Sequence, residues 1–224
     1  MGEYYCWVNV DRKEYISPFD FAYGNKRFES CQRDGEVLRT LRDLLSKEWK
    51  GSRIFWLGDE CGLPENISNE LFASVKNQCD EFCCSGYIFD TVFESYINVS
   101  SLYKASEENV RKEIENYLFE IAHGNNNEIN EYGVNPLNPF NGLFQRDGIN
   151  SKYIINFTKK ICYSFDETKM LFQDGTECDY VDPLPFFMGY GEGLVPGEWL
   201  GDIIGVSDVI QDNITIIESI TLPW

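Results

Sequence analysis

The stretch YYCWVNVDRKEYISP, residues 4–18, decides the fold predicted for this chain. Residues 4–10 are rich in aromatic and β-branched side chains, and residues 14–16 resume that pattern after the polar triplet Asp11-Arg12-Lys13. Two such runs separated by a short polar turn predict a β-hairpin. Pro18 then ends the pairing, because proline has no backbone N–H to donate to a neighbouring strand.

A second hairpin of the same kind is predicted at residues 152–164, which read KYIINFTKKICYS. Asn9 and Asn156 occupy the same place in the two stretches. Farther along, Trp49 and Trp199 each open a Trp-x-Gly-x-x-Ile pattern, at nearly the same distance from their asparagine. Two motifs that recur in the same order favour an internal duplication, in which two units pack together about a pseudo-twofold axis.

These four residues are interpreted first as structural anchors. Asparagine side chains bond to nearby backbone groups and stabilise turns, which suits Asn9 and Asn156. Burial at the entry to a strand suits Trp49 and Trp199, and the alternative is a pair of rings that stack on a ligand. Residues that recur in both copies of a repeat more often have a structural role than a catalytic one. The repeat therefore predicts the fold and assigns no catalytic residue.

The predicted fold class is α+β: internally duplicated β-hairpin units form a mainly antiparallel sheet, with a partly helical insertion between the units. The first unit covers residues 1–63, with a hairpin, a helix and a strand. The insertion and a long loop cover residues 64–150, and the second unit covers residues 151–224. A chain of 224 residues can hold all of this in one compact domain.

Apolar side chains at helical spacing predict helices over residues 35–48, 64–79 and 107–123. Residues 53–57 are expected to form a buried strand, and residues 85–97 are expected to be extended. Residues 124–150, rich in Asn, Gly and Pro, are expected to form a long loop whose role the sequence does not assign. The isoleucine-rich end of the chain is expected to supply closing strands.

The chain is strongly acidic, with 37 Asp and Glu against 19 Lys and Arg and a formal net charge of −18. Residues 151–224 carry four Lys and no Arg against twelve Asp and Glu, and no Lys or Arg follows Lys169. Such a surface repels nucleic acid and anionic membranes, so binding to either is not expected. It attracts a basic protein surface, and the alternative is a solvated acidic face that aids solubility.

Signals for a metal, a cofactor or a membrane are weak. Cys79, Cys83 and Cys84 cluster, but their spacing is not a common zinc pattern and the single histidine, His123, is far away in sequence. We expect buried free thiols and no cofactor, with a metal or redox site as the weaker alternative. No apolar run reaches the length of a membrane span and no signal-peptide pattern is present, which predicts a cytoplasmic protein, in the host cytoplasm if the chain is phage-encoded.

No catalytic residue is assigned, because no catalytic motif stands out. The glycine-rich residues 189–193 have the composition of a phosphate loop, but Glu192 lies among them and no Lys-Ser/Thr follows, so a tight structural loop is expected. If the two units enclose a binding site, its polar groups are expected near the repeated motifs: Lys13, Lys26, Glu29, Arg53, Asp59, Glu192 and Asp202.

The motifs at both ends of the chain resemble a family of uncharacterised bacterial and phage proteins, whose sequences read M-G-x-Y-Y, V-N-x-x-K-x-E-Y-I-x-P, G-x-K-x-x-E and W-x-G-D-x-I. The matching residues in the first part are Met1 to Tyr5, Val8-Asn9, Lys13 to Ile16, Pro18, Gly24, Lys26, Glu29, Trp49, Gly51, Ile54 and the Gly-Asp pair Gly58-Asp59. In the later part they are Ile155-Asn156, Lys159-Lys160, residues 183–185, residues 189–193, Trp199, Gly201, Asp202 and Ile204. The resemblance implies no established activity. The chain departs from it at Ser52, where Asp is usual, and at Glu192, where basic residues are more usual.

Two function hypotheses follow. The first is a non-enzymatic interaction protein that binds and inhibits a basic partner protein, as immunity and phage anti-defence proteins do; it follows from the charge, the 15% aromatic content and the lack of a catalytic motif. The second is an enzyme or small-ligand-binding protein with a site between the two units. A deep pocket lined by the seven polar residues named above favours the second hypothesis, and their dispersal over the surface argues against it.

Overall fold

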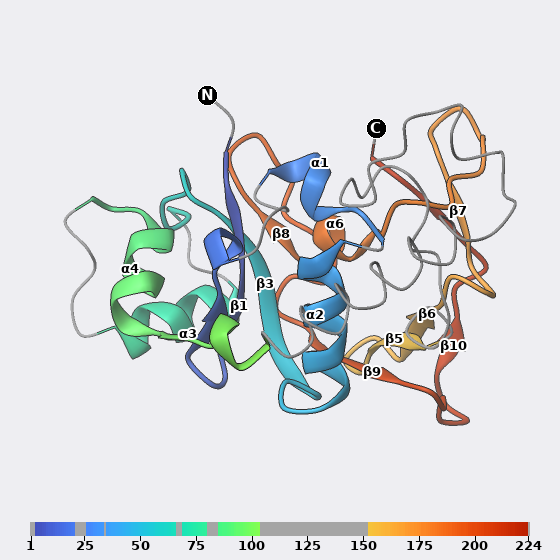
Figure 1. Cartoon of the computed structure of the whole chain (residues 1–224), viewed down its shortest axis with the longest axis horizontal. Helices are drawn as coiled ribbons and strands as arrows, with labels where there is room; N and C mark the ends of the chain where they lie inside the picture. The colour runs from blue at the N-terminus through green and yellow to red at the C-terminus, as the bar shows by residue number, and fades with distance from the viewer. Residues whose placement is uncertain are drawn as a thin grey trace, which may run out of the picture.

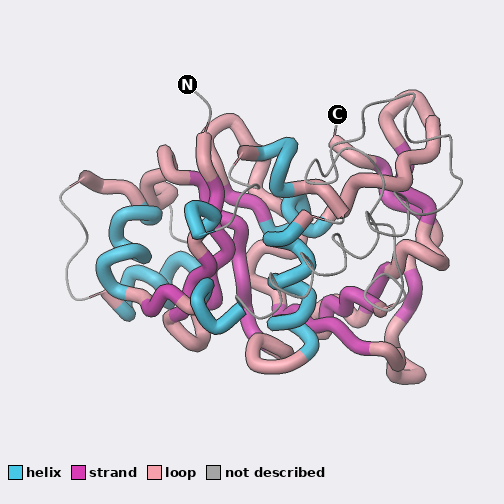
Figure 2. Tube along the Cα trace, viewed as in Figure 1, coloured by secondary structure: helices cyan, strands magenta, loops and turns pink. Residues whose placement is uncertain are grey.

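The computed structural model describes residues 3–20, 26–33, 35–65, 69–79, 85–103 and 152–223. These residues form a nine-stranded mixed sheet, a separate two-stranded sheet and several short helices (Figure 1). Most pairings in the larger sheet are antiparallel. Figure 2 shows the helices, in cyan, gathered around the strands of the first half, whereas strands and loops make up most of the second half.

The first predicted hairpin is confirmed. Strands β1 (Tyr5–Asn9) and β2 (Glu14–Ile16) pair antiparallel. The turn between them is held by the side chain of Asn9, whose Oδ1 accepts a hydrogen bond from the backbone N–H of Arg12 at 3.1 Å. Lys13 closes the turn with a φ of 54°, a left-handed conformation that reverses the chain direction.

The second predicted hairpin is confirmed as well, and its turn is built in the same way. Strands β5 (Tyr153–Asn156) and β6 (Ile161–Tyr163) pair antiparallel. Asn156 Oδ1 accepts a hydrogen bond from the backbone N–H of Lys159 at 2.9 Å, and Lys160 has a φ of 58°. Asn9 and Asn156 are both fully buried, so each turn is stabilised by a buried side chain.

Two central strands, β3 (Ser52–Gly58) and β9 (Ile203–Ser207), join the hairpins. Asn9 lies opposite Ile54 across β1 and β3, and Asn156 lies opposite Ile204 across β5 and β9. The central strands themselves pair antiparallel, with Arg53 opposite Ile203. Arg53 and Ile203 each precede the residue that lies opposite the asparagine of its hairpin, so the two halves have the same pairing register on either side of this contact.

The correspondence extends to both edges of the sheet. Edge strand β4 (Ile97–Asn98) pairs parallel with β2, and edge strand β10 (Thr215–Ile216) pairs parallel with β6. The order β10-β6-β5-β9-β3-β1-β2-β4 therefore shows the same pattern from either end. Two further pairings lie off this path: β8 (Gly189–Tyr190) runs beside β3, and β7 (Lys169–Leu171) pairs with β11 (Ser219–Thr221).

One face of the sheet carries the largest core. Helix α2 (Glu36–Ser46) is drawn beside β3 and above β9 in Figure 1, and its apolar stripe is buried in one core with these strands and with α6 (Leu184–Met188). Trp49 and Trp199 are 0% and 2% exposed within this core. The indole N–H of Trp49 donates to Glu14 Oε2 at 2.7 Å, and the ring of Trp199 stacks on Phe187.

The other face is covered differently in the two halves. In the first half, α3 (Glu70–Gln78) and α4 (Ile88–Ser95) bury the outward side chains of β1 and β3. In the second half, a small cluster around Ile155 and Cys162 covers the corresponding strands. Both helices lie between β3 and β4 in sequence, so the pairing pattern of the first half continues beyond residue 63 to β4, inside the segment predicted as an insertion.

The predicted helix at 35–48 and strand at 53–57 are confirmed. The extended segment predicted at 85–97 is wrong for most of its length, because Ile88, Phe89 and Val92 form one buried helical stripe in α4. The helix predicted at 64–79 begins at Glu70, where Asn69 caps its N-terminus. Short helices were not expected at α1 (Arg27–Ser30), η1 (Pro18–Asp20) and η2 (Ser100–Tyr103).

The helix predicted at 107–123 and the loop predicted at 124–150 lie outside the described residues. Among the helices that the structure describes, none combines the length and the apolar character needed to cross a membrane.

Candidate functional site

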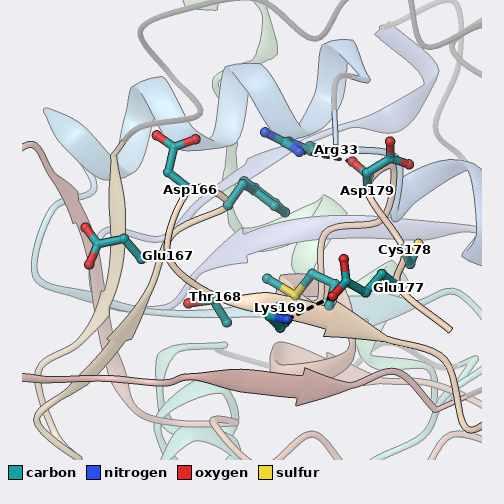
Figure 3. Close-up of a pocket in the computed structure, with 10 residues that line it drawn as sticks. Arg33, Asp166, Glu167, Thr168, Lys169, Glu177, Cys178 and Asp179 are labelled. Atoms are coloured by element: carbon teal, nitrogen blue, oxygen red, sulfur yellow. Dashed lines mark hydrogen bonds and ion pairs between the residues drawn. The ribbon is translucent and has the colours of Figure 1, made fainter. Parts of the chain in front are cut away.

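A pocket of about 460 Å³ opens beside β7 in the second half (Figure 3). It is lined by Arg33, by residues 165–170 and by residues 177–179. The first of these runs is the turn that leads from β6 into β7, and the second follows β7, where Glu177 lies opposite Leu171. Its volume lies in the range of pockets that hold small ligands or single side chains.

The wall formed by the turn before β7 is fixed by Thr168. The backbone N–H of Thr168 donates to the carbonyl of Ser164 at 2.9 Å, and its hydroxyl donates to the carbonyl of Ile217 at 2.7 Å. Thr168 and Met170 are buried, whereas Asp166, Glu167 and Lys169 are exposed. The pocket therefore has an apolar inner part and a charged rim.

Arg33 comes from the first half of the chain and is held against the pocket by its backbone and its side chain. Its N–H donates to the carbonyl of Tyr180 at 3.0 Å, and its guanidinium donates to the carbonyl of Asp179 at 3.0 Å. The same guanidinium lies 4.1 Å from the centre of the Phe165 ring, within cation–π range. These contacts fix the position of Arg33 at the mouth of the pocket.

A buried ion pair lies on the core side of Phe165. Arg42 of α2 is 1% exposed at its side chain and Asp182 is 0% exposed, and the Arg42 guanidinium donates to Asp182 Oδ2. Asp182 Oδ1 also accepts from the hydroxyl of Tyr163 at 2.6 Å and from the N–H of Leu184 at 3.0 Å. Burial, together with the nearby carboxylate, raises the pKa of Tyr163, so its hydroxyl keeps its proton.

Four carboxylates surround the pocket, against two cations. Lys169 pairs with Glu177 at 3.0 Å, with both side chains more than two thirds exposed. Glu167 accepts a hydrogen bond from the hydroxyl of Tyr153. The carboxylates of Asp166 and Asp179 accept no hydrogen bond from any residue that the structure describes, and in Figure 3 they lie on either side of Arg33. The rim therefore offers two carboxylates to a cation from outside.

The pocket is not arranged for nucleophilic chemistry. Burial raises the pKa of the Cys178 thiol above its usual value, so the thiol stays protonated and weakly nucleophilic at neutral pH. Burial raises the thiol pKa in the same way at Cys6, Cys31, Cys61 and Cys162. The chemistry that the pocket supports is the binding of a cationic group by carboxylates.

The seven polar residues proposed from the sequence do not line this pocket. Three of them, Arg53, Asp202 and Lys13, lie where β3 begins. Arg53 donates to Asp11 from Nε at 2.8 Å and from its backbone N–H at 2.7 Å. Asp202 accepts from Asn156 Nδ2 at 2.8 Å. Lys13 donates from Nζ to the carbonyl of Gln78 at 3.0 Å. Burial would raise the pKa of Asp11, but the hydrogen bonds from Arg53 outweigh it and lower that pKa.

Asp59, Glu192 and Lys26 lie where β3 ends, and Glu29 belongs to α1, which follows Lys26 directly. Asp59 Oδ1 accepts from the N–H of Tyr4 at 2.9 Å, and the Lys26 ammonium lies 6.0 Å from the centre of the Tyr4 ring. The N–H of Glu192 donates to Glu3 Oε1 at 2.7 Å. The two ends of β3, which is seven residues long, are about 20 Å apart. The predicted polar residues therefore form two separate groups, one at each end of β3, and do not line a single pocket.

The glycine-rich loop is packed tightly against its surroundings at Gly189 and Gly191, whereas a Cβ added at Gly193 would meet no atom within 4 Å. A Cβ added at Gly189 would lie 2.7 Å from the carbonyl oxygen of Pro185, and one added at Gly191 would lie 2.6 Å from the hydroxyl of Tyr5. Both glycines are therefore required by close approach of the chain. Around Gly189 and Gly191, protein atoms fill the space that a phosphate loop leaves for its ligand.

The weak metal prediction has no support in the described part of the chain. Cys79 is buried, and Cys83 and Cys84 lie outside the described residues. No group of three or more His, Cys, Asp or Glu side chains that could hold a metal ion is found among the residues described.

The sequence-based prediction missed the pocket residues: Arg33, Asp166, Glu167, Glu177 and Asp179. The only signal for the four carboxylates in the sequence is the acidic excess of residues 151–224, which predicts a charged surface without locating a pocket. Arg33 in particular has no signal, because it reaches the pocket through backbone pairing with residues 179–182.

Comparison with protein-family models, with curated proteins and with solved structures finds no match to this chain. The resemblance to the bacterial and phage family therefore stays a prediction from the motifs.

Proposed function

We propose that this chain is a non-enzymatic acidic interaction protein that binds a basic partner protein and inhibits it, in the manner of an immunity or anti-defence protein. One observation carries the proposal: of the twelve Asp and Glu of residues 152–223, ten are exposed, against four Lys in the same segment. An acidic surface of this size steers a basic partner toward the chain and favours its bound state.

The sites that the structure describes support binding over catalysis. The pocket beside β7 presents carboxylates and a neutral thiol, and the polar residues near the two repeats are engaged in separate structural contacts. The six described cysteines are free and buried, which is consistent with action in a reducing cytoplasm, that of the host if the chain is phage-encoded.

The proposal includes the origin of the scaffold. We infer that the two halves arose by internal duplication, with α3 and α4 inserted between β3 and β4 of the first copy. The support is the shared register of β1 on β3 and of β5 on β9, the two equivalent asparagine turns, and the edge strands β4 and β10 in corresponding places. The acidic surface would then be a property that the second copy acquired after duplication.

The test is affinity capture with charge-matched variants. Immobilised wild-type chain is compared with a variant that carries six amide substitutions in the second half (Asp166→Asn, Glu167→Gln, Asp179→Asn, Asp208→Asn, Asp212→Asn and Glu218→Gln). We expect the wild type to retain a basic protein that elutes as salt is raised toward 1 M, and the variant to lose it. A captured partner that is acidic, or whose retention is the same on both chains, would overturn the proposal.

A further inference from the structure

We propose, building on the function proposed above, that the pocket beside β7 receives a lysine or arginine side chain of the basic partner. The pocket is a cavity of about 460 Å³ and thus offers more than a flat acidic surface. A flat acidic face attracts cations without choosing among their positions, whereas a cavity with a charged rim selects one side chain. The pocket would therefore fix where the partner docks.

The inner part of the cavity matches the carbon chain of such a residue. Met170 and Cys178 are buried at 3% and 5% exposure, and Phe165 is partly buried beside them. Lysine and arginine place three or four methylene groups along apolar surface while the charged end stays near water or a carboxylate. The apolar residues form the smaller part of the lining, and they give the carbon chain of a long cationic side chain a surface that a small inorganic cation would not use.

The rim supplies carboxylates for the charged end. The carboxylates of Asp166 and Asp179 accept no hydrogen bond from the described residues, and Figure 3 shows the two side chains on either side of Arg33. The Phe165 ring already has the guanidinium groups of Arg33 and Arg42 over it, at 4.1 Å and 4.8 Å. Recognition of a further cation is therefore assigned to the two carboxylates.

Lys169 shows how a cation from outside would be accommodated. Its ammonium is held by Glu177 at 3.0 Å, but the two side chains are 69% and 68% exposed. An ion pair this exposed contributes little stability, so an incoming ammonium or guanidinium can replace Lys169 on Glu177 at small cost. Removing the Lys169 charge should then strengthen binding, because Glu177 becomes a third carboxylate for the partner.

The experiment measures binding of a hexalysine peptide by titration calorimetry at low and at high salt. The pocket variant is Asp166→Asn with Asp179→Asn. The matched control is Asp208→Asn with Asp212→Asn, which removes the same charge from the exposed loop between β9 and β10. We expect the pocket variant to lose about tenfold in affinity and the control less than about threefold, while Lys169→Gln gains about threefold.

The outcomes separate this inference from the function on which it rests. If the wild-type chain does not bind hexalysine even at low salt, the proposed function fails and the pocket proposal fails with it. If the wild type binds but the pocket and control variants lose affinity equally, attraction is a property of the whole surface and only the pocket proposal is overturned. A loss confined to the pocket variant, with the gain at Lys169→Gln, supports both.

Discussion

The buried contact between Arg42 and Asp182 makes the sharpest stability prediction for this protein. The change is Asp182→Ala. It leaves the Arg42 guanidinium in the core without its carboxylate, and it removes the acceptor of the Tyr163 hydroxyl and of the Leu184 N–H. Because these donors are buried, water cannot fully replace the lost carboxylate.

The expected loss is large for a single substitution. Removing one partner of a buried ion pair costs about 3–5 kcal/mol, since it leaves the other charge uncompensated. A domain of this size has a total unfolding free energy of only about 5–15 kcal/mol. For a chain of this length such a loss corresponds to a fall in Tm of roughly 6–20 °C.

Urea unfolding followed by tryptophan fluorescence measures the change, because Trp49, Trp56 and Trp199 are all buried in the same core. The double variant Arg42→Met with Asp182→Leu is expected to recover part of the loss, because it removes the buried unpaired charge but leaves the Tyr163 hydroxyl and the Leu184 N–H without their acceptor. If the alanine variant does not fold, Asp182→Asn, which keeps one acceptor oxygen, is measured in its place. A loss below about 1 kcal/mol for Asp182→Ala, or no recovery in the double variant, would refute the reasoning.

Three other substitutions test separate parts of the structure. The pKa of Asp11 is lowered by Arg53, so the stabilisation from this pair is present above the unfolded pKa of about 3.9 and is lost as pH falls through the folded value. Asp11→Asn should therefore cost about 1 kcal/mol at pH 7 in urea unfolding and less as pH falls below the unfolded pKa, and a cost that does not change with pH would contradict the pairing. A Cβ at Gly197 would lie 2.2 Å from a backbone carbonyl oxygen, so Gly197→Ala should lower stability by about 1–3 kcal/mol in a thermal scan, and an unchanged Tm would contradict the packing. Asp202→Ser removes the acceptor of the buried Asn156 amide and should cost about 1 kcal/mol in urea, whereas a neutral effect would show that another group replaces it.

The difference between the two halves at this last position shows what sequence reasoning can and cannot find. In the second half Asn156 Nδ2 donates to Asp202. In the first half the corresponding residue is Ser52, and Asn9 Nδ2 is buried without a hydrogen-bond partner among the residues that the structure describes. The sequence alone predicts the equivalence of the two asparagines. It does not predict that one amide is satisfied and the other is not, because that depends on which side chain reaches it.

The segment at 85–97 was misread for a related reason. Its β-branched and aromatic residues suit a strand by propensity, yet Ile88, Phe89 and Val92 also lie on one face of a helix. Packing of that face on β3 and on the outward side chains of β1 decides between the two. Intrinsic propensity is a small preference, and burial of a complete apolar face outweighs it.

The sequence by itself determined the two hairpins, their asparagine turns, the buried tryptophans and the acidic character of the second half. These features depend on residues close together in the chain, or on composition. Only the tertiary structure decided that the halves join through Arg53 and Ile203, that Arg42 meets Asp182, and that Arg33 reaches the turn before β7 to complete a pocket. The contacts of Arg42 with Asp182 and of Arg33 with Asp179 join residues 140 and 146 positions apart. Their geometry is set by how the sheet, α2 and the segment after β7 pack together, which no local sequence pattern encodes.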